Sequence, residues 1–120
     1  MNLNIVKLEQ FTKDVKKLYK KYKQLPHDLE QLAKELNQDP KSGIDLGANC
    51  FKIRLANSSI PTGKSGGFRV VYYYYDGEDN LYLMTMFSKR DMENISDEAI
   101  LELVKRYGLS GLDKWGRYTM

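Results

Sequence analysis

The fold is decided by Phe51-Lys52-Ile53-Arg54-Leu55-Ala56, then Phe68-Arg69-Val70-Val71-Tyr72-Tyr73-Tyr74-Tyr75, then Leu81-Tyr82-Leu83-Met84-Thr85-Met86-Phe87. In the first stretch, large apolar residues alternate with Lys, Arg and Ala, which is typical of a strand with one buried face. The second stretch is rich in Val and Tyr, which favour strands, and a turn beginning at Asp76-Gly77 leads into the third. We therefore predict three antiparallel strands, the last two joined as a hairpin.

Helical patterns lie on both sides of these strands. Before them, two apolar stripes are expected, Phe11, Val15, Leu18 and Tyr22 and then Leu29, Leu32, Ala33 and Leu36, the second helix opening at Pro26. After them, Ser96 is an expected N-cap, Ile95 can pack on Ile100, and Gly108 can close the helix. With a short strand near residues 3–6, the order predicts an α+β fold, in which two N-terminal helices pack on a small antiparallel sheet and a C-terminal helix follows.

The length and composition indicate one domain in the cytoplasm. A chain of 120 residues suits a single core, which we expect over residues 1–109, with a tail over residues 110–120. The single cysteine excludes an internal disulfide and fits a reducing compartment. No apolar run approaches the roughly 20 residues of a membrane span, so we expect no membrane association.

Several kinds of chemistry are disfavoured by the residues present. His27 is the only histidine and Cys50 the only cysteine, and neither sits in a motif, so we expect no metal, no cofactor and no cysteine nucleophile. Gly63-Lys64-Ser65 resembles a phosphate-binding P-loop, but that motif needs a glycine where Ser58 stands and a helix where a strand is expected. Nucleotide hydrolysis is therefore not predicted.

The distribution of charge is more informative than the net charge of +3. No acidic residue occurs between Asp45 and Asp76, although Lys52, Arg54, Lys64 and Arg69 do, which favours an anionic partner. Strand alternation places Lys52 and Arg54 on one face, Arg69 opens the next strand, and Lys89-Arg90 follow the last. If the register allows it, five cations converge.

Two basic segments can be interpreted either as solvent-exposed surface or as ligand-binding surface. The loop of residues 58–67 carries Lys64 either toward a ligand or simply into solvent, and its glycines can let the backbone approach a ligand closely. The lysines of residues 7–23, including Lys13 and Lys17, form either a solvated helix face or an RNA-binding one.

RNA cleavage is a reaction that such a cluster can support. Attack of a ribose 2′-hydroxyl on the adjacent phosphate needs a proton acceptor, a proton donor for the leaving 5′-oxygen, and positive charge near the phosphorane. Crowded cations favour the neutral, basic form of a lysine side chain, so lysine and arginine can fill these roles without histidine.

The strand segments, together with Gly63-Lys64-Ser65-Gly66-Gly67-Phe68-Arg69 and Ser88-Lys89, resemble the RelE/HigB-like toxins of bacterial toxin–antitoxin pairs, in particular the HigB-like branch with its Gly-Lys-x-Gly-Gly-x-Arg segment. The resemblance extends loosely over residues 11–107. It implies a RelE-like fold, arrest of translation through metal-independent cleavage of mRNA on the ribosome, and a cognate antitoxin, expected to be a helix-turn-helix DNA-binding protein.

The resemblance also implies roles for individual residues. Lys52 and Arg54 match cations that flank the scissile phosphate, with Lys52 or Lys89 as the general base. Arg69 matches the arginine that stabilises the transition state, and Lys89-Arg90 match the basic pair near the leaving group. RNA contacts are expected at the remaining four predicted positions, Lys64, Tyr73, Lys13 and Lys17.

One departure from the family pattern keeps a second function open. Where the RelE branch has a tyrosine that stacks on RNA or helps activate the 2′-hydroxyl, this chain reads Met92-Glu93-Asn94-Ile95-Ser96. The alternative is a non-catalytic binding module on the same fold, either a gyrase inhibitor or a degenerate toxin that only binds its antitoxin.

Overall fold

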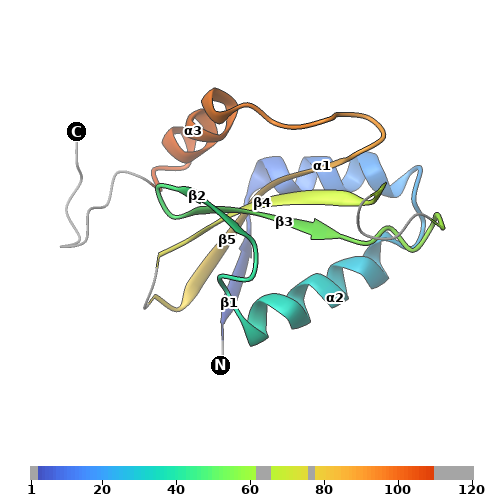
Figure 1. Ribbon diagram of the computed structural model, residues 1–120, viewed down its shortest axis with the longest axis horizontal. Coiled ribbons are helices and arrows are strands. Elements are labelled where there is room, and N and C mark those ends of the chain that lie inside the picture. The colour runs from blue at the N-terminus through green and yellow to red at the C-terminus, as the bar shows by residue number, and fades with distance from the viewer. Residues whose placement is uncertain (1–2, 62–65, 76–77, 110–120) are drawn as a thin grey trace.

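The computed structural model describes residues 3–61, 66–75 and 78–109, which form three helices around one sheet (Figure 1). In chain order the elements are β1 (Asn4–Lys7), α1 (Glu9–Tyr19), α2 (Leu25–Gln38), β2 (Ile44–Gly47), β3 (Cys50–Leu55), β4 (Phe68–Tyr74), β5 (Asn80–Ser88) and α3 (Asp97–Arg106). The predicted α+β class and the order of helices and long strands are confirmed. The predicted tail lies outside the described residues.

The sheet differs from the predicted antiparallel one. Its order is β1-β5-β4-β3-β2, and β1 runs parallel to β5, so the sheet is mixed. Strand β2 was not predicted, because all four of its residues are exposed and no buried face marks it in the sequence. It folds back on β3 through Gly47, Ala48 and Asn49, whose φ values are all positive.

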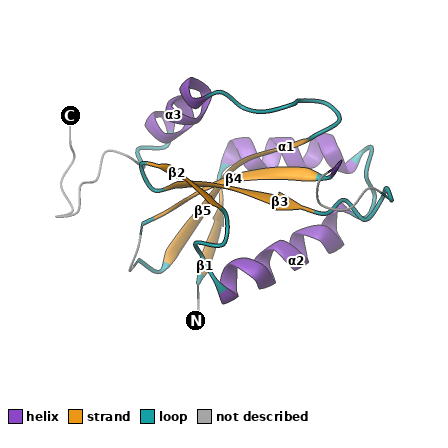
Figure 2. Ribbon diagram, in the orientation of Figure 1, coloured by secondary structure: helices purple, strands orange, loops and turns teal. Residues whose placement is uncertain are grey.

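Two apolar layers cover the sheet, one on each face (Figure 2). Helices α1 and α2 pack on the face formed by alternate residues such as Ile53, Val70 and Tyr72. Helix α3 packs on part of the opposite face, against Cys50, Val71 and Tyr73 among others. Strand β4 is buried at every position because it lies in the middle of the sheet between both layers, which explains its continuous run of Val and aromatic residues.

Helix α3 begins and ends where the sequence predicts. The Ser96 hydroxyl accepts a hydrogen bond from Ala99 N at 3.1 Å, and Asp97 and Glu98 occupy the first turn, where the helix dipole favours negative charge. Gly108 adopts a φ of +68°, the left-handed conformation that ends the helix. No helix among the described residues is long and apolar enough to cross a bilayer.

The edge of β5 is completed by a side chain of α1. Strand β1 pairs with β5 only as far as Leu83, after which the chain turns into α1, with Leu8 N donating to Leu83 O at 3.1 Å. The Asp14 carboxylate then accepts hydrogen bonds from Met86 N, at 3.1 Å, and from the Thr85 hydroxyl. Asp14 therefore satisfies a backbone donor that would otherwise need another strand.

We expect Asp14→Ala to lower the free energy of unfolding by about 1–3 kcal/mol, because Met86 N and the hydroxyl of the buried Thr85 lose their acceptor. Urea denaturation followed by circular dichroism measures the loss. Glu30→Ala, which removes an exposed carboxylate from α2, is the matched control and should change stability by less than about 0.5 kcal/mol. Equal stabilities of the two variants would contradict this role for Asp14.

Candidate functional site

The register of β3 and β4 brings the predicted cations together. Arg54 lies directly opposite Arg69, and Lys52, two residues earlier, points to the same face of the sheet. Lys89 follows β5 beside them. These four cations line a cleft of about 180 Å³, here called the basic cleft, whose full lining is Ile44, Lys52, Arg54, Arg69, Lys89, Glu93 and Asn94.

The two arginines form an electrostatically unfavourable pair. Arg69 is 7% exposed, and its guanidinium donates to the carbonyl oxygen of Phe68 at 3.2 Å. Burial lowers the pKa of the Arg69 guanidinium from its ordinary value, the charge of Arg54 lowers it further, and Glu93 raises it. Like charges directly opposite on neighbouring strands destabilise a sheet. An anion bound between them would relieve that repulsion.

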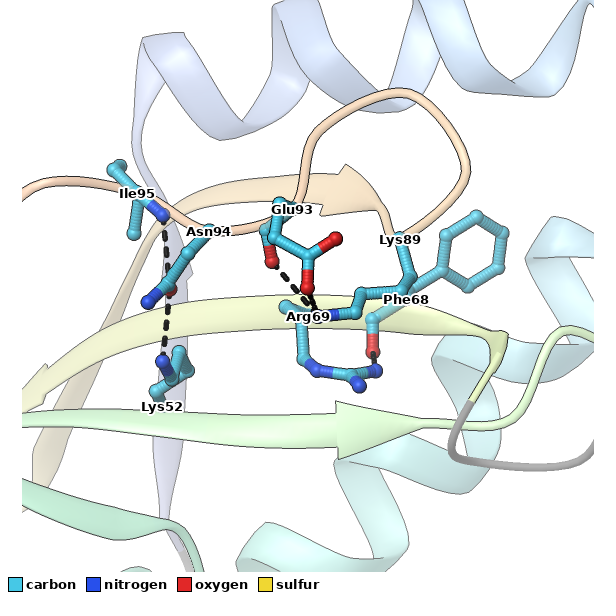
Figure 3. A network of polar contacts seen from close by, with 7 residues as sticks. All are labelled: Lys52, Phe68, Arg69, Lys89, Glu93, Asn94 and Ile95. Carbon is cyan, nitrogen blue, oxygen red and sulfur yellow. Dashed lines mark hydrogen bonds and ion pairs between the residues drawn. The ribbon is translucent and has the colours of Figure 1, made fainter.

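A loop over residues 89–95 supplies the partners of the two lysines (Figure 3). Lys89 Nζ donates to Glu93 O and Glu93 Oε1, each at 3.0 Å, and Lys52 Nζ donates to Asn94 Oδ1 at 2.9 Å. Both amines therefore act as hydrogen-bond donors in this structure, whereas the family resemblance implies that one of them accepts a proton.

Sequence reasoning missed Glu93 and Asn94 as members of the site. Both lie in the segment of residues 92–96, where the sequence departs from the family pattern by lacking a tyrosine. The sequence contains one indication of this contact. Glu93 follows Lys89 by four residues, and this separation is short enough for the two side chains to meet in a tight loop.

Three of the other predicted residues, Arg90, Lys13 and Lys17, do not line the cleft. Arg90 is exposed beside Lys89 but does not line the cleft. Lys13 and Lys17 are exposed on α1, where Lys13 forms an ion pair with Glu9 at 3.4 Å. Lys64 lies outside the described residues.

The position of Tyr73 does not support an RNA contact. It is on the same face of the sheet as Arg69, as alternation predicts, but α3 covers that end of the face and leaves the side chain 5% exposed. Its hydroxyl donates to Leu109 O at 3.2 Å and accepts from Asn49 Nδ2 at 3.4 Å. Burial raises the pKa of the phenol. Tyr73 is a core residue under α3.

Cys50 is likewise a core residue. It is 2% exposed beneath α3, and burial raises the pKa of its thiol to about 11, with a further contribution from Asp45. A thiol with that pKa is almost entirely un-ionised at neutral pH, and the thiolate is the nucleophilic form. Across the described ranges, no three His, Cys, Asp or Glu residues lie close enough together to hold a metal ion.

Gly67 positions the start of β4 against its neighbours. A Cβ atom on Gly67 would lie 2.3 Å from Leu55 O and 2.9 Å from Asn57 N, both backbone atoms of β3 and the residues after it. The Gly67 carbonyl also accepts a hydrogen bond from Lys89 N at 2.9 Å. The glycine-rich pattern of this segment predicts close approach of a ligand, whereas Gly67 permits close approach of two parts of the chain.

Comparison with known proteins points to one family. A family model described as the RelE toxin of the RelE/RelB toxin–antitoxin system matches residues 5–109. The fold is similar to that of a free arginine-to-alanine double mutant of the E. coli toxin RelE, with a TM-score of 0.58 and 22% identity, and to the isolated E. coli RelE toxin, with a TM-score of 0.53 and 21% identity. It is also similar to the same mutant in complex with a peptide of the antitoxin RelB, with a TM-score of 0.55 and 21% identity. Each match covers 88% of this chain and 98% of the other.

We expect Gly67→Ala to destabilise the protein by about 1–3 kcal/mol, because the new methyl group forces the backbones of β3 and β4 apart. Thermal unfolding monitored by circular dichroism measures the change. Ser58→Ala, at an exposed position in the same connection, should leave the melting temperature almost unchanged. A Gly67→Ala protein as stable as the wild type would show that the contact with Leu55 O does not constrain the strands.

Proposed function

The chain belongs to the RelE toxin family, and we propose that it is the toxin of a toxin–antitoxin pair, which arrests translation in the cytoplasm by cleaving mRNA on the ribosome. The observation that carries this proposal is the basic cleft, where side chains from β3, β4 and the segment after β5 bring four cations to one small surface. A volume of about 180 Å³ is too small for a drug-sized ligand and suits a phosphodiester with its flanking ribose oxygens.

Each cation has a role that its chemistry permits. The guanidinium groups of Arg54 and Arg69 can bind the scissile phosphate through paired donors and stabilise the charge of the phosphorane. Lys52 can hold a neighbouring phosphate oxygen, and the Lys89 ammonium can give a proton to the leaving 5′-oxygen. Arg90, exposed beside Lys89, is placed to contact the RNA backbone outside the cleft. These roles require no metal.

Binding partners are proposed on the same basis. One of the similar structures is E. coli RelE bound to a peptide of its antitoxin RelB, and we propose that a cognate antitoxin, itself a DNA-binding protein, holds this chain inactive. The exposed lysines Lys13 and Lys17, together with Lys64 in the glycine-rich segment, are proposed to contact phosphates of ribosomal RNA or mRNA.

Expression of the wild-type chain without an antitoxin should stop bacterial growth, and Arg54→Ala or Arg69→Ala should restore it. Loss of one group that stabilises the transition state typically lowers the rate about 10²–10³-fold. Arg69 is buried, so its replacement can also impair folding. Arg54 is exposed to solvent, so Arg54→Ala tests the cleft with less effect on folding. Arg106→Ala, which removes an equal charge from an exposed position on α3, is the control and should remain toxic. Immunoblots establish equal expression. Arrest that persists in both cleft variants would refute a role for the basic cleft.

Primer extension on mRNA from the expressing cells should show new 5′ ends inside coding regions soon after induction, because the proposed cleavage occurs on translated messages. The Arg54→Ala strain, at equal protein level, should lack them. Intact mRNA together with DNA damage would instead identify the chain as a gyrase inhibitor. Growth without arrest would identify a protein that only binds its antitoxin.

A further inference from the structure

The basic cleft contains one acidic side chain among the described residues, Glu93. We propose that Glu93 is the general base of the cleavage reaction, which accepts the proton of the attacking ribose 2′-hydroxyl. This inference rests on the proposed ribonuclease function and assigns its proton acceptor to the carboxylate of the basic cleft in place of a lysine.

The hydrogen bonds in the cleft identify Glu93 as the acceptor. Arginine has no acceptor atom, and Lys52 and Lys89 both act as donors here. Asn94 Oδ1 is already engaged by Lys52 Nζ and by Ile95 N, both at 2.9 Å, and an amide oxygen is a very weak base. The Glu93 carboxylate is the remaining group in the lining with lone pairs basic enough to take a proton.

The position of Glu93 suits contact with a substrate. Its side chain is 88% exposed, although it hydrogen-bonds with Lys89 through Oε1, so the carboxylate is accessible to a ribose laid across the cleft. Figure 3 shows Glu93 on the loop above β4, on the same side as the Arg69 guanidinium. The oxygens that would receive the proton thus lie on the same side of the sheet as the guanidinium that would bind the phosphate.

The reaction balances with the residues of the cleft alone. Glu93 takes the 2′-hydroxyl proton while the 2′-oxygen forms a bond to phosphorus, and the bond from phosphorus to the 5′-oxygen breaks. The Lys89 ammonium protonates the departing 5′-oxygen, so the products are a 2′,3′-cyclic phosphate and a 5′-hydroxyl. Glu93 is then protonated and Lys89 neutral. Transfer of one proton across their 3.0 Å hydrogen bond restores both groups for the next turnover.

The cations around Glu93 offset the repulsion between its carboxylate and the phosphate of a bound RNA. The charged groups that face it are Arg69 from β4, Lys52 and Arg54 from β3, and Lys89 from its own loop. The lining has four cationic side chains and one carboxylate, and this excess of basic groups attracts RNA.

Glu93→Gln tests the assignment, because glutamine has nearly the same shape but cannot hold the proton. The measurement is the single-turnover rate of cleavage of an mRNA on programmed ribosomes, together with the affinity of the toxin for the ribosome. We expect the rate to fall by about 10²–10⁴-fold with binding retained, and Glu93→Asp to recover part of it. Glu102→Gln, which removes an exposed carboxylate from α3, is the matched control and should cleave at the wild-type rate.

A pH series separates a proton acceptor from a residue that only holds Lys89 in place. A general base gives the pH–rate profile a limb that depends on that base, so the limb on the acidic side of the wild-type profile should be absent in Glu93→Gln. A Glu93→Gln rate within about threefold of the wild type, or an unchanged pH profile, would overturn the assignment. If that occurs while Arg54→Ala is inactive, only the role of Glu93 fails. If the wild type itself does not cleave RNA, the proposed function fails, and the role of Glu93 fails with it.

Discussion

The close contact between Gly67 and the end of β3 is the constraint on which the rest of the structure depends. It allows β4 to start directly against Leu55, so Arg69 comes to lie opposite Arg54. The Gly67 carbonyl binds the backbone of Lys89 on its other side and brings the segment after β5 to the same point. One position without a side chain therefore joins the three segments that carry the four cations.

The basic cleft contains an electrostatic repulsion that lowers the stability of the fold. Two guanidinium groups on neighbouring strands repel each other, and one of them is buried. The fold tolerates this cost because β4 is packed on both faces, and because the loop of residues 89–95 supplies acceptors to Lys52 and Lys89. A bound phosphate would replace the unfavourable contacts between cations with favourable ones, so the cleft is suited to bind a phosphate group.

Much of the site was predictable because strand alternation is a local property. The period of two in residues 51–56 placed Lys52 and Arg54 on one face, and the capping residues of α3 fixed both ends of that helix. Tyr73 shows the limit of this reasoning. Alternation assigned it to the correct face, but part of that face is covered by α3, and coverage depends on packing between segments far apart in the sequence.

By itself, the sequence determined the long strands, the three helices, the strand faces and the resemblance to RelE toxins, because periodicity, capping and motifs act over a few residues. The tertiary structure alone decided that β1 pairs in parallel, that the exposed β2 exists, and that Glu93 and Asn94 meet the cations. Strand partners, register and loop closure depend on contacts between segments separated by tens of residues, and no local pattern of side chains encodes them.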